Sequence, residues 1–189
     1  MAISDDQMYR ALAVAFSTHP SANLLQVAKA AGVSKTTLYR FASTRERLLD
    51  LLRQEGVRRS QLMYDSANLE SAPPRQAVSQ LAKNLLTERE FCAFMFTDYE
   101  LVQKANFATE DSWTAQCVAF ESRLDALFLR GQKEGVFRLE MPASWMTDLF
   151  YSILYAVVDA ERRGRLAPAD MHKFFQASFF DGACISSSA

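Results

Sequence analysis

One glycine-centred turn constrains the fold of this 189-residue chain more than any other feature. The segment Leu24–Arg45 has the sequence LLQVAKAAGVSKTTLYRFASTR. Gly32 follows an apolar helical run and can adopt the left-handed backbone conformation that ends a helix. Ser34 can then cap the next helix by accepting a hydrogen bond from a backbone N–H one turn further on. The segment therefore predicts two helices that meet at a sharp turn.

The two predicted helices have complementary apolar faces and one polar face. The apolar positions are Val27, Ala28 and Ala31 on the first helix, and Val33, Leu38 and Phe41 around the second. The opposite face of the second helix carries Lys35, Thr36, Tyr39 and Arg40. Cations, hydroxyls and an aromatic ring in this arrangement suit a helix that lies against phosphates and base edges. A helical hairpin of plain architecture would not need that selection, so the segment predicts a DNA-binding helix-turn-helix.

The pattern AxxAGVSKxTLYRF, at residues 28–41, resembles the tetracycline-repressor (TetR) family of transcriptional regulators. The match covers about the first third of the chain and continues into Arg45-Glu46-x-Leu48. Two departures are visible: Phe41 follows Tyr39 by two residues where the family usually has an aromatic after three, and the connection at residues 18–23 looks shorter than usual. The resemblance implies an all-α fold with an N-terminal three-helix helix-turn-helix head for DNA and a C-terminal helical domain for ligand binding and dimerisation.

The expected DNA contacts fall into two groups. The base edges and adjoining backbone are assigned to Lys35, Thr36 and Tyr39. Phosphate contacts are assigned to Asn23, Ser34, Thr37, Arg40 and Arg45. Asn23 is also a good N-cap for the helix before the turn, where exposed N–H groups can take a phosphate. Arg45 would open the next helix, where a cation opposes the helix dipole and is better tolerated beside a phosphate.

The charge distribution supports a nucleic-acid partner at one end of the chain. The net charge is only −1, but residues 1–63 carry nine Lys and Arg against five Asp and Glu. The remaining residues are therefore acidic overall. A basic head on an acidic body suits a protein that presents one end to DNA.

Helical periodicity continues through the chain, and no period-2 strand pattern appears. Ser4-x-x-Gln7 and Ser43-x-x-Glu46 are capping boxes that predict the starts of two helices. We expect a DNA-binding domain at residues 1–48 and a helical ligand-binding and dimerisation domain at residues 49–185.

Aromatic residues concentrate in the middle of the chain. A pocket for a small, largely hydrophobic effector is expected from seven of these and neighbouring apolar side chains. They are Phe91, Phe94, Met95, Tyr99, Phe107, Trp113 and Phe120. For any single member, a place in the core is the simpler explanation.

The last two long helices are apolar on more than one side, which indicates that a second subunit covers them. The expected interface residues are Phe150, Tyr151, Leu154, Tyr155, Phe175 and Phe179. The family resembled here forms a four-helix bundle across a two-fold axis with its final two helices. The resemblance thus implies a homodimer that binds a palindromic operator, most often as a repressor.

Other classes of protein have less support in the sequence. His19 and His172 are the only histidines, and neither a Glu-x-x-His metal pair nor a glycine-rich phosphate loop occurs. We expect no metal, no cofactor and no enzymatic activity. Three scattered cysteines suggest a reducing compartment, and no membrane-spanning run is present, so the expected location is the cytoplasm. Two alternatives stay open: a DNA-binding dimer without a small effector, and a helical enzyme or carrier.

Overall fold

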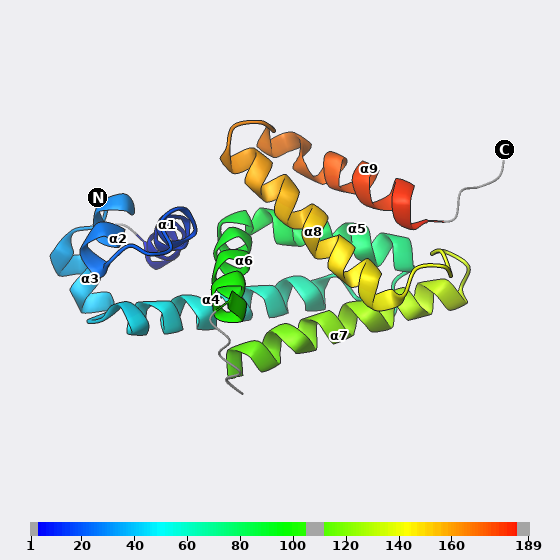
Figure 1. The fold of residues 1–189 in the computed structure, drawn as a ribbon, viewed down its shortest axis with the longest axis horizontal. Helices are drawn as coiled ribbons and strands as arrows, with labels where there is room; N and C mark the ends of the chain where they lie inside the picture. Colours follow the sequence, from blue (N-terminus) through cyan, green and yellow to red (C-terminus); the bar gives the residue numbers. More distant parts are fainter. Residues whose placement is uncertain (1–3, 105–111, 185–189) are drawn as a thin grey trace. The chain divides into compact units, whose positions relative to one another are not determined.

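The computed structural model describes residues 4–104 and 112–184 (Figure 1). Its helices are α1 (Asp5–Thr18), α2 (Leu24–Ala30), α3 (Lys35–Phe41), α4 (Arg45–Ser66), α5 (Pro74–Thr87), α6 (Arg89–Lys104), α7 (Ser112–Lys133), α8 (Ala143–Arg162), the 3₁₀ helix η1 (Pro168–Asp170) and α9 (Met171–Ala183). Within the described ranges, the only β-type pairing is an isolated bridge between Phe137 and Cys184. The predicted all-α fold is confirmed.

The chain divides into two compact units. The first unit contains α1, α2, α3, α4 as far as Arg59, and α6. The second contains the rest of α4, from Ser60, with α5, α7, α8, η1 and α9. The first unit therefore extends past residue 48 and includes a helix from much later in the sequence. The physical reason is that α6 packs along α1.

The core of the first unit explains why α6 belongs to it. Leu12 of α1, Val27 of α2 and Leu38 of α3 are completely buried. Phe91 and Phe94 of α6 join the same cluster of buried side chains. Short helices alone bury little apolar surface, so the two rings add a substantial part of the core.

Side-chain caps define where helices begin, and one differs from the prediction. Ser4 caps α1 in the predicted capping box. For α4 the sequence predicts Ser43 as the cap, paired with Glu46. Instead, the hydroxyl of Thr44 accepts a hydrogen bond from the backbone N–H of Arg47 at 3.1 Å. Ser and Thr are both good caps, so composition alone does not decide between neighbouring positions.

The second unit is built around aromatic rings of α8 and α9, which run side by side (Figure 1). The ring centroids of Phe150 and Phe175 lie 5.2 Å apart, and Phe175 stacks on Phe179 at 5.7 Å. These three residues and Leu154 are at most 1% exposed within a single chain. Their predicted place at a dimer interface is corrected, because side chains covered by their own chain cannot reach a second subunit. Tyr155 is 41% exposed and stays a candidate.

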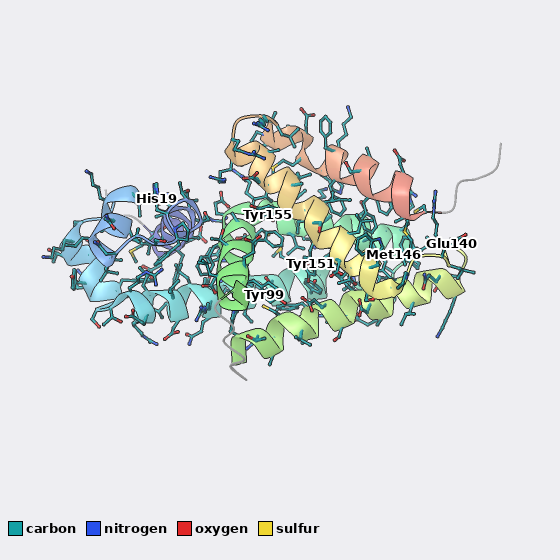
Figure 2. The ribbon with its side chains drawn as sticks, in the orientation of Figure 1. His19, Tyr99, Glu140, Met146, Tyr151 and Tyr155 are labelled. Carbon is teal, nitrogen blue, oxygen red and sulfur yellow. The ribbon has the colours of Figure 1, made fainter. Side chains whose placement is uncertain are left out.

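Tyr151, the remaining predicted interface residue, also points inward. Its hydroxyl hydrogen-bonds the hydroxyl of Tyr64, a fully buried residue of α4. Burial is the main cause that raises the pKa of Tyr151 well above the ordinary value for tyrosine. Figure 2 labels Tyr151 and Tyr155, which both lie on α8. The sequence pattern could not distinguish the two, since both are tyrosines on the same amphipathic helix.

We expect Gly131→Ala to destabilise the protein by about 1–3 kcal/mol, because α7 packs too closely for a side chain at this position. A Cβ atom there would lie 2.3 Å from Cδ2 of Phe137 and 3.0 Å from Cβ of Pro74. Gly182→Ala is the matched control, since a Cβ in this α9 position meets nothing within 4 Å. Urea denaturation followed by circular dichroism measures both variants. Equal unfolding free energies for the two would contradict the close packing.

Candidate nucleic-acid interface

The turn between α2 and α3 has the geometry that the sequence predicts. Gly32 has φ +67°, in the left-handed region, and a Cβ placed there would meet nothing within 4 Å. The backbone N–H of Val33 donates to the carbonyl of Ala28 at 2.9 Å, which satisfies a carbonyl at the end of α2. Glycine is therefore required here by its backbone conformation and not by lack of space.

Polar side chains cap both helices of the motif. Asn23 Oδ1 accepts a hydrogen bond from the N–H of Gln26 at 3.0 Å, and Gln26 Oε1 accepts from the N–H of Asn23 at 2.8 Å. Ser34 Oγ accepts from the N–H of Thr37 at 3.1 Å. The Ser34 and Thr37 hydroxyls are themselves 2.7 Å apart. Both predicted caps are confirmed, and they fix the starts of two short helices that meet at Gly32.

The recognition helix, α3, presents the predicted residues to solvent. Leu38 is completely buried, whereas Lys35, Thr36, Tyr39 and Arg40 are exposed. The Lys35 ammonium lies 5.6 Å from the centroid of the Tyr39 ring, so the two form one surface feature. A cation and an aromatic hydroxyl side by side can donate to base-edge acceptors and to phosphate oxygens.

Arg45 has a structural role that the sequence did not reveal. Its Nε donates to the carbonyl of Ala22 at 3.1 Å, and its Nη2 donates to the carbonyl of Pro20 at 2.6 Å. The guanidinium also lies 5.4 Å from the centroid of the Phe16 ring. Arg45 thus holds the connection between α1 and α2. The nearby sequence carries no signal for this, because the partners precede it by more than twenty residues.

The predicted effector residues are divided between the two units. Phe91 and Phe94 are buried in the core of the first unit, and Met95 packs against that core. Tyr99 is half-buried on the same helix. Phe107 lies outside the described residues.

Trp113 and Phe120 are buried in the second unit. The Phe120 ring centroid lies 4.7 Å from that of Tyr64, which brings Phe120 to the pair formed by Tyr64 and Tyr151. Trp113 Nε1 is buried without a hydrogen-bond partner among the described residues. A buried donor of this kind normally finds an acceptor, so Trp113 gives the second unit an unmet polar group.

Three further properties concern residues 4–104 and 112–184. This part of the chain contains no group of three His, Cys, Asp or Glu residues that could hold a metal ion. No described helix is long and apolar enough to cross a membrane. Burial raises the pKa of the Cys92 thiol to about 12, so this thiol stays protonated at neutral pH.

Comparisons with known proteins agree with the helix-turn-helix geometry. The chain is 38% identical over 179 residues to the HTH-type transcriptional regulator NfxB of Pseudomonas aeruginosa, covering 95% of this chain and 94% of NfxB. The structure of the ketosteroid regulator KstR2 of Mycobacterium tuberculosis matches with a TM-score of 0.76 at 15% identity, covering 98% of both chains. The chain belongs to the TetR family of transcriptional regulators.

A further structure supports the TetR fold. The TetR-like regulator LfrR of Mycobacterium smegmatis matches with a TM-score of 0.68 at 18% identity, covering 94% of both chains. No protein-family model matches the chain. Members of the TetR family bind DNA, act as dimers and are not enzymes. The predicted resemblance is therefore confirmed, and the alternative of a helical enzyme or carrier is wrong.

Proposed function

We propose that this TetR-family regulator is a ligand-responsive repressor that binds a palindromic operator as a homodimer in the cytoplasm. The observation that carries the proposal is the exposed row of Lys35, Thr36, Tyr39 and Arg40 on a capped helix after the Gly32 turn. In a two-fold symmetric dimer, two such helices meet half-sites about 34–36 Å apart, or a multiple of this spacing.

Within this proposal, the polar residues of the motif fall into two groups. Lys35, Thr36 and Tyr39 meet base edges and give specificity. Ser34, Thr37, Arg40 and Asn23 meet phosphates and position the head. Support for Asn23 comes from its exposed side chain, whose amide nitrogen donates to no group in the described ranges.

Arg45 contributes mainly by holding the α1–α2 connection. Its Nε and Nη2 are engaged with backbone carbonyls, whereas Nη1 has no acceptor among the described residues. That remaining nitrogen can meet a phosphate at the edge of the interface.

The effector is proposed to bind in the second unit. Support comes from the aromatic residues Phe120, Tyr64 and Tyr151 together with the unpartnered Nε1 of Trp113. A largely hydrophobic molecule with one hydrogen-bond acceptor matches these groups. LfrR has been crystallised in complex with proflavine, which supports a small-molecule effector for a protein of this fold. Reciprocal coupling between effector and operator is expected to be about 1–3 kcal/mol.

The proposed dimer surface is revised to exposed aromatic side chains of α8 and α9. Trp145, Tyr155 and Phe174 are 55%, 41% and 50% exposed within one chain. Large exposed apolar side chains on adjacent helices are typical of a surface that a second subunit covers.

Selection of random duplex DNA on the purified protein tests the proposal. We expect enrichment of a palindrome that a dimer binds, with the stoichiometry measured by analytical ultracentrifugation. Affinity for the selected duplex is expected to fall as salt rises, since phosphate contacts release counterions. Recovery of no enriched sequence would contradict operator binding.

The effector is tested separately by a thermal-shift screen of small apolar compounds, followed by operator titration with each stabilising compound. A compound that stabilises the protein and weakens operator binding is the expected result. If no compound does both, the protein is a DNA-binding dimer without a small effector.

A further inference from the structure

Glu88, at the junction of α5 and α6, joins two other helices of the first unit through its carboxylate. Its Oε1 accepts from Arg10 Nη2 on α1 at 2.8 Å, and its Oε2 accepts from Arg59 Nη1 on α4 at 2.7 Å. The backbone carbonyl of Glu88 also accepts from the N–H groups of Phe91 and Cys92, at 2.9 Å and 3.0 Å. One residue therefore starts α6 and ties it to α1 and α4.

The Arg59 end of this arrangement is well buried. Arg59 is only 7% exposed. Its Nε donates a hydrogen bond to Glu55 Oε1 at 2.8 Å, and its Nη2 donates to Asp6 Oδ1 at 2.5 Å. Its guanidinium lies 4.5 Å from the centroid of the Phe91 ring. Hydrogen bonds from Arg59, and then from Arg10, hold the pKa of Asp6 below its usual value. Removing one partner from a buried charge cluster leaves the others without compensation.

Arg10 and its neighbour Tyr9 connect α1 to α6 and to the recognition helix α3. Arg10 Nη1 also donates to Glu90 on α6 at 3.1 Å, so two carboxylates of the α6 region hold this side chain. The preceding residue, Tyr9, packs its ring edge-on against Phe41, with centroids 4.9 Å apart. Phe41 is the last residue of α3. The position of α1 is thus linked to α6 by ion pairs and to the end of α3 by aromatic packing.

We infer that Glu88 is a positioning residue for operator binding, although it lies far from the helix-turn-helix in the sequence. It holds Arg10 of α1 and Arg59 of α4, and it thereby sets the orientation of α1, whose Tyr9 packs against Phe41 at the end of α3. Small displacements of a recognition helix remove base-edge hydrogen bonds, whose geometry is narrow. The inference rests on the proposed operator binding.

The test compares Glu88→Gln with the wild type on the selected operator and on an unrelated duplex of equal length. The substitution keeps the size of the side chain and removes its charge. We expect operator affinity to fall about tenfold, while affinity for the unrelated duplex changes less than about twofold. The salt dependence of binding should not change, since no phosphate contact is removed. Fluorescence anisotropy gives the affinities, and stoichiometric titration corrects for the active fraction.

Two further variants separate positioning from general damage. Glu140→Gln, at an exposed position of the second unit (Figure 2), is the matched control and should bind the operator as the wild type does. Glu88→Asp keeps the charge on a shorter side chain and should recover part of the affinity, which also covers the case that Glu88→Gln does not fold.

A double-mutant cycle with Arg10→Gln tests the pair directly. If Arg10 and Glu88 act together, the double variant should bind the operator about as weakly as the weaker single variant. Unchanged operator affinity in Glu88→Gln, or equal losses on both duplexes, would overturn the inference and leave the proposed function standing. A wild-type protein that selects no operator would overturn both.

Discussion

Phe94→Ala is expected to lower the free energy of unfolding by about 3–5 kcal/mol and to abolish operator binding at physiological temperature. Phe94 is 1% exposed, and its ring centroid lies 6.3 Å from that of Phe16 in the core of the first unit. Truncation removes the buried ring and leaves a cavity beside α1. Urea denaturation and operator titration measure the two effects.

Leu101→Ala is the matched control, because Leu101 lies on the same helix and is 43% exposed. This substitution should change the unfolding free energy by less than about 1 kcal/mol and leave operator binding intact. If Phe94 lined an effector pocket instead, Phe94→Ala would weaken effector binding at nearly unchanged stability. That result would contradict its assignment to the core.

Lys35→Ala is expected to weaken operator binding by about ten- to a hundredfold, since one good base contact contributes about 1–3 kcal/mol of discrimination. Lys35 is exposed at the start of α3. The N-cap of this helix is Ser34, so the Lys35 side chain is not needed to cap it. Stability and dimerisation should therefore not change. Anisotropy titrations on the selected operator and on single-base variants measure the loss and show which base position becomes tolerant.

Lys133→Ala removes the same charge from an exposed position at the end of α7 and serves as the control. Its effect on operator affinity should be less than about twofold at physiological salt, because distant surface charges are screened. Equal effects of Lys35→Ala and Lys133→Ala would remove Lys35 from the set of base contacts.

The correctly predicted features of the helix-turn-helix depend on residues that are close together in the sequence. The left-handed backbone at the end of α2 favours glycine at position 32. Ser34 caps α3 by accepting a hydrogen bond from the backbone N–H of Thr37, three residues further on. The exposed face of α3 follows from helical periodicity around the buried Leu38. Each of these depends on a few covalently close residues, so the local pattern was sufficient.

The errors share one cause, which is that periodicity shows the side of a helix that is covered and not the partner that covers it. The apolar faces containing Phe94 and Phe150 were correctly expected to be covered. Phe94 packs in the core of the first unit, and Phe150 packs against Phe175 of its own chain and not against a second subunit.

The sequence by itself determined the all-α fold, the helix-turn-helix and the TetR family, because caps, turns and short-range periodicity specify them. Tertiary structure alone decided that α6 belongs with the first unit, that Arg45 holds the α1–α2 connection, and that Glu88 joins α1 to α4. These contacts join residues up to 78 positions apart. Only the packing of the folded chain selects such partners among many side chains of the same kind.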